Sequence, residues 1–238
     1  MNLLLLETHE VSADGLVRLS GRRQEHAREV LRVQAGETLR VGVRGGRCGL
    51  ATVLARDDQA LELRVELNAA PPPRPGIDLI LAIPRPKALK RIIPALASLG
   101  VDRVVLVNAA RVEKSYFDSK VLERTFLDGL IDLGLEQARD TVPPTIELRE
   151  RFKPFIEDEL SAFGPAARLV PHPTASAALA PVPKNQRVLL AIGPDGGWVP
   201  FEIELLAKHG FVPVSLGERV LRVEVAVPTV IGAVRAGP

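Results

Sequence analysis

The 238-residue sequence has few of the side chains that build disulfide scaffolds, metal centres or membrane anchors. Cys48 is its only cysteine, which excludes an intramolecular disulfide and a zinc site made of cysteines. The histidines are scattered without the spacing of metal ligands (His9, His26, His172 and His209). No apolar run approaches the roughly 20 residues that span a bilayer. We therefore expect no metal and no membrane segment.

The first residues also lack the signature of an export signal. MNLLLLETHEV has no basic residue before its leucines, and Glu7 follows them directly, which predicts a first β-strand and no signal peptide. Together with the single cysteine, this favours a cytoplasmic location. The hydrophobic fraction of 46% and the charged fraction of 25% are typical of a globular chain with a packed core.

Lysine is absent from the first 72 residues, whereas arginine is concentrated there. Nine arginines and only three glutamates lie between Arg18 and Arg56. The planar guanidinium group can bind phosphates and base edges, so the cluster indicates an RNA-binding surface. The net charge of +2 is too small to indicate nucleic-acid binding by itself. An alternative explanation of the arginine cluster is the general replacement of lysine by arginine in GC-rich genomes. The candidate RNA-binding residues are Arg22, Arg23, His26 and Arg32.

A proline-rich segment marks the clearest domain boundary. Asn68–Gly76 reads NAAPPPRPG, and three successive prolines favour an extended, semi-rigid linker. We expect one domain over residues 1–72 and a second over 73–238.

The first domain contains short apolar runs separated by turn signals. Gly45-Gly46 predicts a hairpin turn, and Gln24–Val33 is the single predicted helix. This pattern is typical of a small β-barrel-like module. The predicted strands are Leu3–Leu6, Thr38–Val43, Gly49–Ala55 and Leu61–Leu67.

The second domain alternates predicted strands and helices, which indicates an α/β fold with a mostly parallel sheet and helices on both faces. The predicted strands are Ile77–Ile83, Arg103–Val107, Thr145–Leu148, Arg168–Val170, Val188–Ile192 and Val212–Ser215. The predicted helices are Lys87–Leu99, Ser119–Ala138, Lys153–Phe163 and Pro200–Lys208. Ligands of such sheets bind at the carboxyl ends of the strands, so the loops after strands are the places to search.

Two of these loops carry unusual residues. Ile192–Trp198 reads IGPDGGW, and its glycines allow a ligand to approach the backbone, although it is neither a Walker A loop nor a GxGxxG fingerprint. Ser215–Glu224 reads SLGERVLRVE and brings charged side chains to the end of the last strand. Taken alone, the first loop is equally consistent with a structural turn, and the second is better explained as a capped loop with surface charges.

Together the two loops resemble a known family. IGPDGGWVPFEIELL resembles an IGPEGG-F-S-x-x-E-x-x-LL segment, and LGERVLRVE resembles LG-x-R-I-L-R-x-E. Further matches are His26–Arg32, Gly36-Glu37, Lys90 with Leu99–Val101, and Glu136-Gln137 followed by Pro144. The chain is thereby identified as a member of the bacterial 16S rRNA uridine-N3 methyltransferases, the RsmE type within the SPOUT superfamily.

The resemblance implies a PUA-like RNA-binding β-barrel followed by a SPOUT domain with a C-terminal trefoil knot. It also implies S-adenosylmethionine as the cofactor, 16S rRNA of the small ribosomal subunit as the substrate, and a homodimer with its active site at the subunit interface. By position, the cofactor-binding residues are Ile192, Gly193, Gly196, Gly197, Leu216, Gly217, Val220 and Leu221.

Methylation of uracil at N3 requires loss of a proton, because the protonated nitrogen is a poor nucleophile. The resemblance implies that Arg219 and Arg222 face the RNA or the reacting uracil. Arg222 is the candidate stabiliser of the uracil anion, and Glu224 is the candidate base. No metal is needed, because the sulfonium group supplies its own electrophile.

The chain departs from the family pattern at several positions. Val223 and Val225 replace two threonines, Pro228 interrupts the expected final helix or begins it, and Asp140 replaces an arginine. Two alternatives therefore stay open. The first is a SPOUT methyltransferase that acts on another RNA position. The second is an RNA-binding or ribosome-assembly protein whose cofactor site has decayed.

Overall fold

The computed structural model describes residues 2–21, 24, 34–57 and 59–236, and it divides the chain into two compact units. Unit 1 comprises Met1–Pro73 and Leu135–Pro143, and unit 2 comprises Arg74–Gly134 and Pro144–Pro238. The first division falls one residue beyond the expected one, but the grouping of Leu135–Pro143 with unit 1 was not predicted. The four candidate RNA-binding residues lie outside the described residues, as does the predicted helix Gln24–Val33 beyond Gln24.

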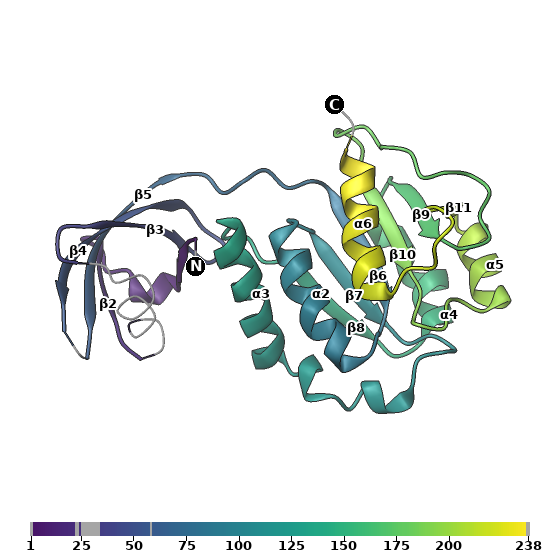
Figure 1. Cartoon of the computed structure of the whole chain (residues 1–238), viewed down its shortest axis with the longest axis horizontal. Helices are drawn as coiled ribbons and strands as arrows, with labels where there is room; N and C mark the ends of the chain where they lie inside the picture. The colour runs from purple at the N-terminus through teal and green to yellow at the C-terminus, as the bar shows by residue number, and fades with distance from the viewer. Residues whose placement is uncertain (1, 22–23, 25–33, 58, 237–238) are drawn as a thin grey trace. The chain divides into compact units, whose positions relative to one another are not determined.

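The described part of unit 1 forms a five-stranded sheet in the order β1-β3-β4-β5-β2 (Figure 1). Strand β1 pairs with β3 in parallel, and the other pairs are antiparallel. The strands are β1 (Leu4–Leu6), β2 (Leu16–Leu19), β3 (Thr38–Val43), β4 (Cys48–Arg56) and β5 (Leu61–Ala69), with a short 3-10 helix η1 (Thr8–Glu10). Strand β2 was not predicted, because four residues with a central arginine carry too little periodicity.

Alternate side chains of these strands face one core, as the period of two requires. Leu61, Leu63 and Val65 of β5 are buried, while Glu62 and Arg64 between them are exposed. Leu4, Leu6, Val41 and Val53 belong to the same hydrophobic cluster. The predicted strands of this unit are thus confirmed in place.

The segment Leu135–Pro143 is tied to the turn between β3 and β4 through Thr141. Gly45 N–H donates to the Thr141 carbonyl at 2.7 Å, and the Thr141 hydroxyl donates to the Gly46 carbonyl at 2.6 Å. A Cβ added to Gly42 would lie 2.3 Å from Thr141 Cγ2, so only glycine fits there. These contacts join residues that are far apart in the sequence, and no local pattern could have predicted them.

The described part of unit 2 contains a six-stranded sheet in the order β11-β9-β10-β6-β7-β8, and every pair is parallel. This confirms the predicted parallel α/β fold. Every residue of the two central strands β6 and β10 is buried, as expected for strands covered on both faces. The strands are β6 (Ile77–Ala82), β7 (Arg103–Val107), β8 (Thr145–Arg149), β9 (Ala167–Pro171), β10 (Val188–Ile192) and β11 (Val212–Val214).

The strand order creates a switch point between β6 and β10. From β6 the chain continues through α2 (Pro86–Ser98) to its neighbour β7, whereas from β10 it continues through α5 (Pro200–Lys208) towards the opposite edge. Right-handed crossovers therefore put α2 and α5 on opposite faces. Figure 1 shows the final helix α6 (Val223–Arg235) beside α2. A crevice for ligands is expected where β6 and β10 end.

Two predicted helices differ substantially from the observed structure. The predicted helix over Lys153–Phe163 is instead a succession of α4 (Phe152–Pro154), a π-helical turn η4 (Phe155–Glu159) and a 3-10 turn η5 (Leu160–Phe163). Tertiary packing decides this, because the turns bury Phe155, Ile156, Leu160 and Phe163. Helix α3 (Arg124–Ala138) begins five residues later than predicted, after the 3-10 turns η2 (Lys114–Tyr116) and η3 (Lys120–Leu122).

The final helix corrects the expectation for Pro228. Helix α6 begins at Val223 and runs through Pro228, so the proline neither interrupts nor starts it. Proline lacks the N–H that would bond to the Glu224 carbonyl, which ordinarily destabilises a helix interior. Burial of Val227, Val230, Ile231 and Val234 compensates for that loss.

The described residues show neither a membrane-spanning helix nor a metal-binding group. No described helix is both long and apolar enough to cross a bilayer. Within the described part of the chain, no group of three or more His, Cys, Asp or Glu side chains is placed so that it could hold a metal ion.

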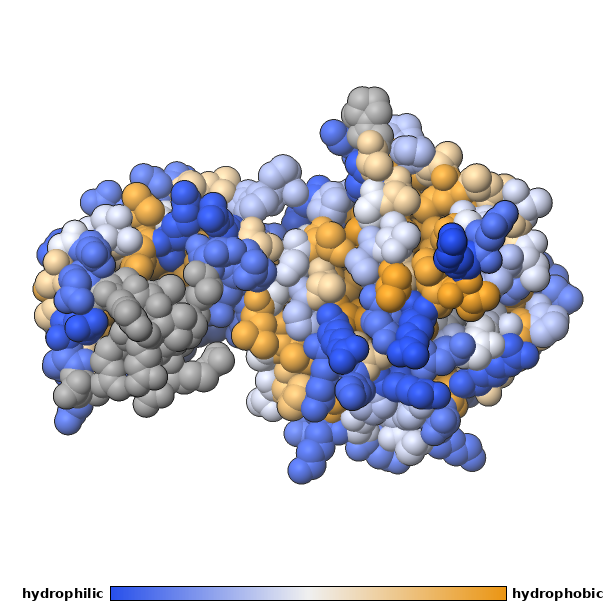
Figure 2. Space-filling model, in the orientation of Figure 1, coloured by the Kyte–Doolittle hydropathy of each residue, from blue (hydrophilic) through white to orange (hydrophobic). Residues whose placement is uncertain are grey.

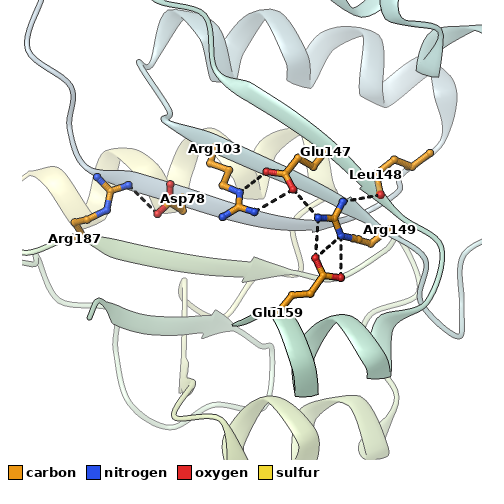
Figure 3. A network of polar contacts seen from close by, with 7 residues as sticks. All are labelled: Asp78, Arg103, Glu147, Leu148, Arg149, Glu159 and Arg187. Carbon is orange, nitrogen blue, oxygen red and sulfur yellow. Dashed lines mark hydrogen bonds and ion pairs between the residues drawn. The ribbon is translucent and has the colours of Figure 1, made fainter. Parts of the chain in front are cut away.

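A polar network joins β7, β8 and the π-helical turn η4 (Figure 3). The Arg103 side chain donates to both carboxylate oxygens of Glu147, at 2.6 and 3.0 Å. Arg149 also donates to Glu147 at 2.8 Å and lies 2.8 Å from Glu159. The hydrogen bond from Arg103 is the main cause that lowers the pKa of Glu147 below its usual value of 4.5.

We expect Glu147→Gln to destabilise the protein by about 1–2 kcal/mol at pH 7, because it removes a charged acceptor from two arginines. A lowered folded-state pKa means that the carboxylate stabilises the fold above pH 4.5 and loses this effect as pH falls through the lowered pKa. The difference between wild type and variant should therefore shrink below about pH 4. Thermal unfolding of both proteins at pH 7, 5 and 3.5 measures this difference in stability.

The control is Glu157→Gln, which breaks an exposed pair with Lys153 at 3.8 Å and should have little effect. Asp78 acts in the opposite sense, because burial raises its pKa above 3.8 despite the hydrogen bond from Arg187. Asp78 therefore makes the protein less stable as pH rises through the raised pKa of its carboxyl group. This effect is the same in the wild type and in both variants. A Glu147→Gln difference that stays constant from pH 7 to 3.5 would contradict the assignment.

Candidate active site

The candidate site lies at the switch point, where the loops after four neighbouring strands converge. Strand β6 is followed by Ile83-Pro84-Arg85, and β10 is followed by the glycine-rich loop 193–199. Strand β9 leads into His172-Pro173, and β11 leads into the loop 215–222. The sequence pointed to two of these loops and missed those after β6 and β9.

One cavity of about 230 Å³ lies between these loops, and we call it the cofactor cavity. All eight residues predicted to bind the cofactor line it, so the structure brings the two motifs together. Sequence reasoning missed further lining residues, although the rule that ligands bind after strands could have indicated those that follow β9. The missed residues are Pro171, His172, Pro173, Pro194, Asp195, Trp198, Val223 and Ala226.

The glycine-rich loop is held close to the ring of Trp198. A Cβ on Gly193 would lie 3.1 Å from the Trp198 backbone nitrogen and 3.2 Å from its ring, so a side chain there would push the loop outward. Trp198 is buried and packs on Phe152, with ring centroids 5.1 Å apart. Its indole N–H has no hydrogen-bond partner among the described residues. Gly197 adopts a φ of +71°, which favours glycine.

The second loop presents unused backbone groups to the same cavity. Gly217 has a φ of +105°, and its N–H donates to the Ser215 hydroxyl at 3.1 Å. The N–H groups of Leu216, Val220 and Leu221 have no hydrogen-bond partner within the described chain. Loops with free backbone donors beside apolar side chains can recognise the edge and the faces of a flat heterocycle.

These features fit S-adenosylmethionine. Leucine, valine and proline side chains line a cavity suited to an adenine ring, and the free N–H groups can meet its ring nitrogens. The two valines that replace family threonines differ in position. Val223 lines the cofactor cavity, whereas Val225 does not and is 45% exposed. The change at Val225 therefore leaves the cavity lining unaltered.

A second cavity, of about 600 Å³, adjoins the first, and we call it the basic cavity. Arg85, Lys87 and Arg91 line it from the start of α2, and Arg222 and Glu224 line it from the start of α6. Figure 2 shows strongly hydrophilic side chains gathered where these helices begin. Both cavities share one wall, made of Pro194, Asp195, Val220, Leu221 and Val223.

The three candidate catalytic residues divide between the two cavities. Arg222 and Glu224 line the basic cavity, and Arg219 lines the cofactor cavity. At the shared wall, Arg85 lies 3.3 Å from Asp195. The catalytic roles stay predictions, but their placement suits a reaction in which a group crosses from one cavity to the other. The cations of α2 were missed, although they directly follow the predicted strand that became β6.

Comparisons with known proteins relate this chain to RNA methyltransferases. A family model described as an RNA methyltransferase domain matches residues 71–235. Ribosomal RNA small subunit methyltransferase E from Treponema pallidum is 30% identical over 95% of this chain and 87% of its own length. The protein of the same name from Synechocystis is 30% identical over 95% of this chain and 74% of its own length.

Solved structures share the fold along nearly the whole chain. The protein Lpg2936 from Legionella pneumophila, solved with the bound cofactor SAM, superposes with a TM-score of 0.78 at 25% identity and covers 99% of this chain and 97% of its own. A ribosomal RNA small subunit methyltransferase E from Neisseria gonorrhoeae, bound to S-adenosyl methionine, gives a TM-score of 0.79 at 20% identity and covers 98% of this chain and 96% of its own.

Proposed function

Because the chain belongs to the RNA methyltransferase domain family, we propose that it methylates N3 of a uridine in 16S ribosomal RNA of the small ribosomal subunit, using S-adenosylmethionine. One observation carries the proposal. The eight residues of the two sequence motifs line a single cavity, and this cavity shares a wall with a second one that is rich in cations. A methyl donor and an anionic acceptor can thus approach each other across that wall.

The cofactor cavity binds and orients the donor. S-adenosylmethionine supplies an electrophilic methyl group on its sulfonium. The free N–H groups of Leu216, Val220 and Leu221 bind the adenine, and the apolar side chains that line the cavity contact its faces. Gly193 and Gly196 let the glycine-rich loop pack closely against Trp198 and Arg111, and a Cβ on Gly197 or Gly217 would point into open space.

The basic cavity receives the uracil. Glu224 accepts the N3 proton, and Arg222 stabilises the negative charge that develops on the ring. Arg219 approaches from the cofactor cavity and contacts the RNA beside the shared wall. A guanidinium group suits this task, since it stays charged at any working pH and donates from a rigid fork.

The remaining features come from the family resemblance. We propose that unit 1 is a PUA-like barrel that binds RNA through the arginine-rich stretch containing Arg22, Arg23, His26 and Arg32. We further propose a trefoil knot at the C-terminal motifs, a cytoplasmic homodimer, and an active site at its interface. The dimer has one supporting observation: Val220 is 82% exposed and Val225 is 45% exposed, so a partner subunit can cover them.

Mass spectrometry of nucleosides from 16S ribosomal RNA tests this function. A strain without the gene should lack one N3-methyluridine that the parent strain contains. The purified protein should restore that methyl group on the undermethylated small subunits when S-adenosylmethionine is added. Unchanged nucleosides in the deletion strain, or a restored methyl group on a ribose or another base, would overturn the proposal.

A further inference from the structure

Three cations stand at the start of α2, and only one of them, Arg85, is paired with an acidic side chain, that of Asp195. Arg85 is the residue before the helix, and Lys87 and Arg91 follow one helical turn apart. The first turn, which the structure describes in full, contains no acidic residue. Lys87 and Arg91 are exposed and make neither a hydrogen bond nor an ion pair with any described residue.

This arrangement weakens the helix that carries it. The N-terminal end of a helix has a partial positive charge, which favours acidic side chains and disfavours basic ones. Like charges at positions i and i+4 also repel each other. Lys87 and Arg91 therefore act against the stability of α2, and a bound anion would reverse both effects.

The cavity in front of these side chains is suited to an anion. Arg222 and the free N–H groups of Val223 and Glu224, at the start of α6, add positive potential from the opposite side. Asp195 is occupied by Arg85 at 3.3 Å, which leaves Glu224 as the other carboxylate among the described lining residues. Cations thus outnumber carboxylates in the cavity.

We propose that Lys87 and Arg91 bind the backbone phosphates that flank the acceptor nucleotide, and so position its base against the wall shared with the cofactor cavity. This inference rests on the proposed function and adds to it an RNA-contact site in unit 2. It makes Lys87 and Arg91 positioning residues, since their charges meet the phosphates and not the reacting base. The competing occupant is the carboxylate of S-adenosylmethionine, which the same cations could bind.

The test uses the full chain with the double substitution Lys87→Ala and Arg91→Ala. Binding to undermethylated small ribosomal subunits is measured as a function of salt. Affinity should fall on the order of tenfold near physiological salt, and the salt slope should flatten by about two, because two phosphate contacts are lost. Affinity for S-adenosylmethionine, measured by calorimetry, should stay unchanged.

Lys90→Ala is the matched control. Lys90 lies on the same helix with the same charge, but it stacks over Phe126 at 4.9 Å and does not line the basic cavity. Its removal should leave the salt slope close to that of the wild type.

A second variant separates this role from a structural one. Lys87→Glu places an acid in the first turn and four residues before Arg91, so its Tm should rise by about 1–4 °C while its affinity for the subunits falls further. A purely structural lysine would give loss of stability and loss of binding together.

The outcomes distinguish this inference from the function it rests on. If the wild type methylates the subunits and the double variant keeps their affinity and salt slope, the phosphate site is wrong and the function stands. If the double variant loses affinity for S-adenosylmethionine, the cations hold the cofactor carboxylate and the inference is overturned. If the wild type neither binds nor methylates the subunits, both fail.

Discussion

Arg222→Ala is expected to slow methyl transfer by about 100-fold while the affinity for S-adenosylmethionine stays close to the wild-type value. Arg222 lines the basic cavity and not the cofactor cavity, so its charge meets the acceptor base. Stabilisation of the uracil anion is needed in the transition state and much less in the ground state. Single-turnover methylation of undermethylated small subunits measures the rate.

A structural role for Arg222 predicts a different result. The Arg222 carbonyl accepts the first hydrogen bonds of α6, from Val225 N–H at 2.9 Å and Ala226 N–H at 2.8 Å, and alanine retains this carbonyl. The side chain makes no hydrogen bond or ion pair with any described residue. Thermal stability should therefore be unchanged, whereas a loop-ordering side chain would cost stability and cofactor binding together.

Raising the pH provides a second measurement on the same variant. Higher pH favours loss of the N3 proton, so it should partly restore the rate of Arg222→Ala. Arg124→Ala, which removes an exposed cation paired with Asp128 on α3, is the control for loss of one charge. A folded Arg222→Ala protein that methylates at the wild-type rate would remove Arg222 from the mechanism.

Gly217→Val is expected to weaken binding of S-adenosylmethionine by about 100-fold or more. A β-branched residue at a φ of +105° is strained by about 1–3 kcal/mol, so the loop moves to relieve it. Movement withdraws the backbone N–H groups of Leu216, Val220 and Leu221 from the cavity. Loss of two to three hydrogen bonds, at about 1 kcal/mol each, accounts for the expected factor.

Tryptophan fluorescence offers a direct readout of this binding. Trp198 is the only tryptophan in the chain, and it lines the cofactor cavity. Titration with S-adenosylmethionine should change its emission in the wild type and leave it unchanged in Gly217→Val at the same ligand concentrations. Calorimetry on both proteins provides the affinity.

The control is Gly210→Val, in the same unit. Gly210 has a φ of +82°, does not line the cavity, and its added Cβ would meet nothing nearer than the Arg168 side chain at 4.0 Å. It should lose stability through the same backbone strain and keep the cofactor affinity. Wild-type affinity in a folded Gly217→Val protein would refute the pocket assignment.

The parts of the fold that the sequence predicts well are those whose cause is local. Val188–Ile192 is a continuous apolar run bounded by turn residues, and it forms β10 with the predicted bounds. Pro200–Lys208 has proline at its first position and forms α5 as predicted. Lys153–Phe163 shows where local reasoning fails, because its apolar spacing indicates an α-helix, whereas the structure buries Phe155, Ile156, Leu160 and Phe163 in π and 3-10 turns.

The sequence by itself determined the parallel α/β fold of unit 2 and the two loops that line the cofactor cavity. Apolar periodicity, glycine and proline act within a few residues of chain, so their consequences can be read there. Only the tertiary structure decided which distant residues meet. The order β10-β6 places the loop after β6 beside the loop after β10, and α6 returns Arg222 and Glu224 to the start of α2. In the same way, Thr141 joins the β3–β4 turn of unit 1. Strand order and helix packing depend on the burial of the whole chain, so no local pattern records that Lys87 and Arg91 share a cavity with Arg222.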